Sequence, residues 1–203
     1  MKTIKLFVTM MLLGITLGAS AQKPAELKEK ASKEAKKEAK RLQKEGWIPA
    51  PGGLPIERQL DRSYFMQYEL NDEMQAKYAF GNAQSTGQFF DAAKLQASEM
   101  AKSDLVGKLT IEVTTLLSSQ LKNINNAEGQ TKSAQAAEAK SKSLISQRLS
   151  GITPILELQR TLKDGRIEVM VQYAYDKSKV TAPVMKEISE ELMSKDITSD
   201  FVE

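Results

Sequence analysis

The chain contains no cysteine and no histidine among its 203 residues. Without thiols it can form neither disulfide bonds nor a thiolate nucleophile, and a zinc site made of cysteine and histidine is excluded. Without imidazole it lacks the side chain that most often transfers protons near neutral pH. Any catalysis would therefore depend on carboxylates, hydroxyl groups, lysine or tyrosine.

Long hydrophobic runs are also scarce. The apolar run from Leu6 to Leu17 has roughly twelve residues, fewer than the roughly twenty that cross a bilayer. It follows the basic residues Lys2 and Lys5 and precedes Ala19-Ser20-Ala21, small residues typical of a signal cleavage site. We therefore expect residues 1–21 to be a removed secretory signal peptide, and the mature protein to be periplasmic or secreted, with no transmembrane segment.

The chain has little excess charge of either sign. Its formal net charge of +3 includes Lys2 and Lys5, so about +1 remains after the expected cleavage. Such a balance creates no overall field that attracts nucleic acid or anionic lipid, and we expect no nucleic-acid partner. The mature length of roughly 180 residues is enough for one domain with a hydrophobic core.

A segment rich in alanine, lysine and glutamate follows the expected signal peptide. Its apolar residues recur every three or four positions, which predicts a basic amphipathic helix within residues 22–46 that ends at Gly46. The residues on this narrow stripe are Leu27, Ala31, Ala35, Ala39 and Leu42. Two interpretations stay open: a solvated surface helix, or a helix that lies on an anionic envelope polymer or lipid headgroups.

Three prolines and a Gly-Gly pair within residues 47–55 exclude a helix or a central strand, and we interpret this segment as a linker held by Trp47. Residues 56–195 are expected to form an α+β domain, and residues 196–203 a disordered acidic tail. Within the domain the pattern predicts helices over 55–72, 89–123, 130–150 and from Thr181, and strands over 78–83, 155–162 and 166–175. The β-branched residues 110–115 fit helix or strand, and we place them in the helix.

The dipeptide Asp164-Gly165 favours a hairpin with a two-residue turn. That turn places Leu162 opposite Ile167, with the large apolar side chains on one face of the ribbon. The members of this face are Leu156, Leu158, Leu162, Ile167, Val169, Val171, Tyr173 and Tyr175, and Arg160 is the one polar intruder. We therefore expect a small antiparallel sheet with a C-terminal hairpin and with helices packed on one face.

The segment from Tyr78 to about Ser178 resembles the Lpp-twenty family of bacterial envelope lipoproteins. The resemblance lies in the strand Tyr78-Ala79-Phe80-Gly81-Asn82-Ala83, the alanine-rich residues 92–105, and Leu149-Ser150-Gly151 before two strands. It implies a compact α+β envelope domain with no catalytic residues to carry over. Members of the family are typically lipidated at a cysteine, which this chain lacks.

Four patterns bear on chemistry, and for each a structural role is the favoured interpretation. Ser119 and Lys122 have the spacing of serine acylases without the companion motifs. Glu69, Asp72 and Glu73 could hold a hard cation but lack the glycine-punctuated loop of a calcium site. Residues 81–87 resemble a phosphate loop only in composition. The aromatic side chains of Tyr64, Phe65, Tyr68, Tyr78 and Phe80 could stack on sugars, although their spacing is typical of core residues.

The sequence therefore predicts an exported, non-enzymatic protein of the bacterial envelope with a structural or binding role. We assign no catalytic, cofactor-binding or metal-binding residue and expect no cofactor. The expected partners are an envelope protein or polymer or a second copy of the chain, with peripheral membrane contact possible. The alternative is a hydrolase that acts on cell-wall or carbohydrate substrates through a pair of carboxylates.

Overall fold

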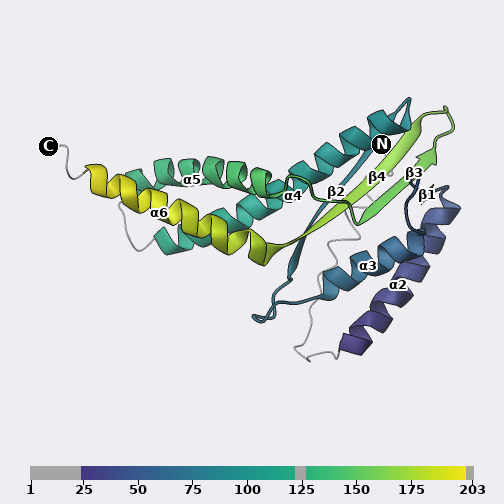
Figure 1. Ribbon diagram of the computed structural model, residues 1–203, viewed down its shortest axis with the longest axis horizontal. Helices are drawn as coiled ribbons and strands as arrows, with labels where there is room; N and C mark the ends of the chain where they lie inside the picture. The colour runs from purple at the N-terminus through teal and green to yellow at the C-terminus, as the bar shows by residue number, and fades with distance from the viewer. Residues whose placement is uncertain (1–23, 122–126, 200–203) are drawn as a thin grey trace.

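The computed structural model describes residues 24–121 and 127–199, and the predicted α+β class is confirmed (Figure 1). Four strands pair antiparallel in the order β1-β3-β4-β2. In chain order the elements are α2 (Pro24–Lys44), β1 (Ile48–Pro49), α3 (Ile56–Tyr68), β2 (Tyr78–Gly87), α4 (Phe90–Leu121), α5 (Ala127–Arg148), β3 (Leu156–Thr161), β4 (Ile167–Asp176), a short 3-10 turn (Lys177–Lys179) and α6 (Thr181–Ser199). The expected signal peptide, residues 1–21, lies outside the described residues.

Helices cover both faces of the sheet, so the prediction of helices on one face is wrong. Along β4, Val169, Val171 and Tyr173 belong to one hydrophobic core together with residues of α4. Met170, which lies between the two valines, belongs to a second core with residues of α2 and α3. Because successive side chains of a strand point to opposite faces, the two cores lie on opposite sides of the sheet. Figure 1 shows α4 on one side of the strands and the α2–α3 pair on the other.

On the α4 side, small residues let helix and sheet approach closely. The strand β2 turns Ala79, Gly81 and Ala83 toward α4, and α4 meets the sheet through Ala93, Ala97 and Ala101. The four-residue spacing then continues through larger residues, Leu105, Leu109, Val113 and Leu117. Since four residues turn about 400°, the stripe drifts about 40° at each step. One buried stripe therefore faces the sheet first and then α5 and α6, with which α4 forms a helical bundle beyond the sheet (Figure 1).

The β-branched residues 110–115 are helical, as we placed them. Their hydroxyl groups bond to the helix itself: Thr110 Oγ1 donates to the Val106 carbonyl at 2.7 Å, and Thr115 Oγ1 to the Ile111 carbonyl at 2.7 Å. These bonds satisfy polar side chains that would otherwise favour a strand.

The linker, residues 47–55, is part of the fold and contributes the edge strand β1. Trp47 is buried in the second core, and the Ala50 amide donates to the Glu157 carbonyl at 3.1 Å. Gln59 fastens both sides: its Nε2 donates to the Leu54 carbonyl at 2.6 Å, and its Oε1 accepts from the Glu157 amide at 2.7 Å. The prolines leave this segment a two-residue strand at the sheet edge, where a missing amide donor is tolerated.

The hairpin forms where it was predicted, but its register differs by one residue. Leu158 lies opposite Met170 rather than Val171, and Leu156 lies opposite Gln172. The Gly165 amide donates to the Leu162 carbonyl at 3.0 Å, and Gly165 has a φ of 81°. This is a three-residue loop with glycine in the left-handed region, and its extra residue shifts the pairing.

The shift divides the predicted apolar face between the two sides of the sheet. Leu156 and Leu158 belong to the α3 side, together with Glu168 and Gln172. The remaining members of the hairpin that pack on α4 are Ile167, Val169, Val171, Tyr173 and Tyr175. The polar residues are satisfied, because Arg160 Nε donates to Glu168 Oε2 at 2.6 Å and the Arg160 guanidinium lies 4.5 Å from the Trp47 ring centroid.

The last helix, α6, begins at Thr181 and buries Val184 and Ile188 as predicted. The Thr181 hydroxyl has no hydrogen-bond partner among the described residues, so it does not cap the helix as the sequence suggested. Residues 196–199, expected in the acidic tail, are helical. Residues 200–203 and the side chain of Leu192 lie outside the described part of the structure.

Candidate interaction surface

The inner face of α2 carries the predicted apolar stripe from Ala31 to Leu42, while the side chain of Leu27, its first predicted member, lies outside the described part of the structure. Ala31, Ala35, Ala39 and Leu42 are at most 3% exposed, and α2 packs on α3. Three of them share the second core with Ile56. The alanines allow a close approach between the two helices. The stripe is therefore occupied by α3 of the same chain and is not available to another molecule.

The outer face of α2 carries lysines. With 100° of rotation per residue they fall within an arc of about 100°, opposite Leu42. All are exposed, and we call the set the lysine ridge: Lys33, Lys36, Lys37, Lys40 and Lys44.

The glutamates along this part of α2 are turned away from the ridge or are paired. Glu34 Oε2 accepts from the Tyr68 hydroxyl of α3 at 2.6 Å, and Glu38 accepts from Arg41 Nε at 2.8 Å. Glu45 also pairs with Arg41. Glu29 pairs with Lys33 at 2.7 Å, at the N-terminal end of the ridge. In the described part of the chain the remaining ridge lysines form no ion pair, so four positive charges stay unneutralised: Lys36, Lys37, Lys40 and Lys44.

At the seam between α2 and α3, the surroundings raise the pKa values of two tyrosines and one arginine. Burial, together with the nearby carboxylates of Glu38 and Glu34, raises the pKa of Tyr64 to about 12. Burial and the hydrogen bond to Glu34 also raise the pKa of Tyr68. The hydrogen bond to Glu38 raises the pKa of Arg41. Near neutral pH the phenols stay neutral and the guanidinium stays charged, so the acids remain engaged at the seam.

The structure describes only one member of the predicted serine–lysine pair, Ser119, and its hydroxyl bonds to its own helix. Ser119 Oγ donates to the Leu116 carbonyl of its own helix at 2.7 Å. Lys122 lies outside the described residues.

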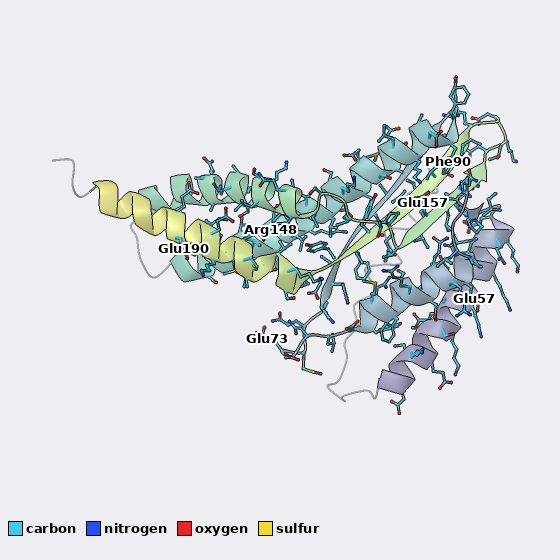
Figure 2. All side chains as sticks on the ribbon, viewed as in Figure 1. Glu57, Glu73, Phe90, Arg148, Glu157 and Glu190 are labelled. Carbon is cyan, nitrogen blue, oxygen red and sulfur yellow. The ribbon has the colours of Figure 1, made fainter. Side chains whose placement is uncertain are left out.

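The acidic cluster before β2 lies in a projecting turn, with Glu73 at its outer end (Figure 2). Glu69 Oε1 is 2.5 Å from Lys77 Nζ, while Asp72 and Glu73 are exposed. Across residues 24–121 and 127–199 no three acidic side chains are grouped so as to hold a metal ion. The turn is instead held by Asn71 Oδ1, which accepts from the Gln75 amide at 2.8 Å.

The glycine-containing residues 81–87 lie inside β2 and do not form a phosphate loop. Their backbone pairs with β4, and on the free edge of the strand the Asn82 amide donates to Asp104 Oδ2 at 3.0 Å. Lys108 Nζ donates to the Phe80 carbonyl at 2.8 Å and also pairs with Asp104. The side chains of α4 thus occupy part of this edge, which would otherwise expose unpaired backbone groups.

The aromatic residues do not gather on one surface. Tyr64 packs against the second core, and Tyr68 reaches α2 through Glu34. Tyr78 and Phe80 are half-buried on β2, and Phe65 is 39% exposed on α3.

A hydrolase of the predicted kind would need a pair of free carboxylates. The two little-exposed carboxylates on the sheet, Glu157 and Glu168, are both held in ion pairs. Glu157, which lies on β3 (Figure 2), is 2.8 Å from Lys94 Nζ. Glu168 is 2.6 Å from Arg160 Nε. Both groups have a clear structural role in joining neighbouring elements, and the hydrolase alternative stays a prediction.

Sequence reasoning found the positive charge of α2 but missed the sorting of its charges. The signal was present, because Glu34, Glu38, Arg41 and Glu45 follow one another at three- and four-residue spacing. That spacing places them along one flank of the helix, beside the alanine stripe. Without α3 in view, nothing showed that this flank faces a neighbour.

None of the described helices is long and apolar enough to span a membrane. No family model, curated protein or solved structure matches the chain. The resemblance to the Lpp-twenty family therefore remains a prediction.

Proposed function

We propose that this chain is an exported protein of the bacterial envelope that acts by binding rather than by catalysis, and that the lysine ridge is its contact surface for anionic envelope material. The signal-like residues 1–21 support export. The observation that carries the proposal is the sorting of charge along residues 33–44 of α2, where Glu34 bonds to Tyr68 of α3, Glu38 pairs with Arg41, and four lysines that pair with no described acid point outward.

An ordinary solvated helix mixes both signs on its surface and pairs them at three- and four-residue spacing. Of the acids at such spacing from a ridge lysine, Glu29 pairs with Lys33 and Glu34 accepts from the Tyr68 hydroxyl, so none of the described acids at this spacing pairs with Lys36, Lys37, Lys40 or Lys44. Lysines without nearby acids repel one another, which costs stability unless an anion neutralises them. This arrangement is what a surface that binds anions requires.

The burial of the alanine stripe decides how the contact can form. Self-association through this stripe would require α2 to leave α3, exposing Leu42 and Ile56. The charged outer face is available without any rearrangement. We therefore assign the contact to the ridge and not to the stripe.

Cell fractionation tests the proposal on the full chain. Four simultaneous substitutions, Lys36, Lys37, Lys40 and Lys44→Gln, remove the four ridge charges that have no ion pair in the described part of the chain and leave the buried face intact. The matched control replaces four exposed lysines scattered over α5, the hairpin, the 3-10 turn and α6: Lys142, Lys163, Lys179 and Lys186→Gln. We expect the ridge variant to lose most of its share in the envelope fraction, and the control variant to keep it.

Equal envelope shares for the wild type and the ridge variant would refute the proposal. Deleting α2 would be a weaker test, because Leu156, Leu158 and Met170 share their core with α2 and would lose their cover.

A further inference from the structure

The lysine ridge is a single line of charge. Neighbours three or four positions apart on a helix have Cβ atoms about 5–6 Å apart. From Lys33 to Lys44 the helix rises about 16 Å. The ridge is thus one helix wide and several charges long, with its lysines one to four residues apart along the axis.

Residues 33–44 of α2 lack the exposed apolar face that a bilayer contact requires. An interfacial helix inserts an apolar face about 5–10 Å into the boundary between headgroups and acyl chains. Between Lys33 and Lys44 the only bulky apolar residue is Leu42, which is 1% exposed against the second core. The ridge can therefore contact a membrane only through its charges. A linear ligand that follows the helix axis can contact the lysines in succession, which a flat surface does not require.

The ridge is built of lysine, not arginine. Lysine acts as a hydrated point charge, whereas arginine presents a planar fork that fixes the geometry of a bound carboxylate or phosphate. Recognition by such a ridge follows charge density along the ligand rather than the shape of each anionic group.

Resting on the proposed function, we infer that the ligand of the ridge is a linear polyanion, a polymer with anionic groups repeated along its length, which lies along α2. The four lysines would neutralise about four anionic groups of the polymer. For a single-stranded polyanion, a tenfold rise in salt concentration should then lower the logarithm of the association constant by roughly three.

The test uses the purified full chain with three probes: inorganic polyphosphate, polygalacturonate, and vesicles of equal parts phosphatidylcholine and phosphatidylglycerol. At equal concentrations of anionic groups we expect polyphosphate to bind tightest, polygalacturonate next and vesicles weakest. The ridge variant should bind polyphosphate roughly tenfold more weakly or worse and with a shallower salt dependence. The scattered-lysine control should bind as the wild type does.

A charge-preserving variant keeps the test decisive. Replacing Lys36, Lys37, Lys40 and Lys44→Arg should retain polyphosphate binding, because the charge remains. Loss of binding in this variant would overturn recognition by charge density.

Two further outcomes separate the two proposals. Ridge-dependent binding to vesicles that is as tight as binding to the polymers would overturn the linear-polyanion inference and leave the proposed envelope contact standing. Equal binding of all three probes by the ridge and control variants would overturn both.

Discussion

The two faces of the sheet hold their helices in different ways. On the α4 side the contact is made by small residues, and a Cβ added at Gly81 would lie 2.6 Å from the Leu105 Cβ. On the α3 side larger side chains fill the space, and a buried chain of hydrogen bonds crosses it. Ser63 Oγ donates to Gln172 Oε1 at 2.5 Å, and Gln172 Nε2 donates to Asn82 Oδ1 at 2.7 Å.

The two faces therefore tolerate different substitutions. Backbone in close approach cannot move away from an added atom, so the α4 side depends on the absence of side chains. The α3 side depends on partners for its buried polar groups. It is also the side that carries α2, so the lysine ridge is attached to the face with directional bonds.

The largest effect is expected from a side chain added on the α4 side. Gly81→Val would force β2 and α4 apart, and we expect a loss of about 3 kcal/mol or more in the free energy of unfolding. Urea unfolding followed by circular dichroism measures it.

The matched control for Gly81→Val is Gly107→Ala on α4, where an added Cβ meets nothing within 4 Å. Because alanine favours a helix interior, this substitution should stabilise the protein by about 0.5–1 kcal/mol. Equal changes in the free energy of unfolding at Gly81 and Gly107 would contradict the close approach of β2 and α4.

A smaller effect is expected from the buried hydrogen bonds on the α3 side. Gln172→Ala leaves Ser63 and Asn82 without this partner, and we expect the free energy of unfolding to fall by about 1–3 kcal/mol. In the same sheet Gln159 is half-exposed, and Gln159→Ala should change stability by less than about 0.5 kcal/mol. Equal losses would mean that the hydrogen-bond chain contributes nothing.

The smallest effect concerns the seam between α2 and α3 and depends on pH. The pKa of Tyr64 is raised to about 12, so the folded state favours the neutral phenol. Its contribution to stability is complete below the ordinary tyrosine pKa of about 10 and is lost as the pH rises through the folded value. The wild type should therefore lose more stability than Tyr64→Phe between about pH 9 and pH 12. Parallel losses in the two proteins would place Tyr64 in solvent.

Much of the fold could be predicted from the sequence because local patterns determine it. The spacing of Ala31, Ala35, Ala39 and Leu42 predicted α2 and its buried face, and Asp164-Gly165 predicted the hairpin. The register failed because two- and three-residue loops share this dipeptide. A two-residue turn would need positive φ at both Asp164 and Gly165, whereas here Gly165 alone of the two has it and Leu162 bonds to Arg166.

The two-sided sheet was missed for a related reason. A slip of one residue would place Glu168 and Gln172 among apolar side chains, which we took as evidence against it. The partners that make this arrangement acceptable, Arg160, Ser63 and Asn82, include residues about 90 to 110 positions away in the sequence. Such long-range compensation leaves no local signal. The lysine ridge is the opposite case, because its residues are local and only the position of α3 showed which face is free.

The central claim is that α2 buries its alanines on α3 and presents its lysines outward, and the absence of cysteine makes this directly measurable. Single variants Ala35→Cys and Lys37→Cys of the full chain would be exposed to a thiol reagent under native conditions. We predict that the thiol at position 37 reacts as fast as in the unfolded chain, and that the thiol at position 35 reacts at least roughly a hundredfold more slowly, because it is reached only when the helix opens. Equal rates at the two positions would contradict the account.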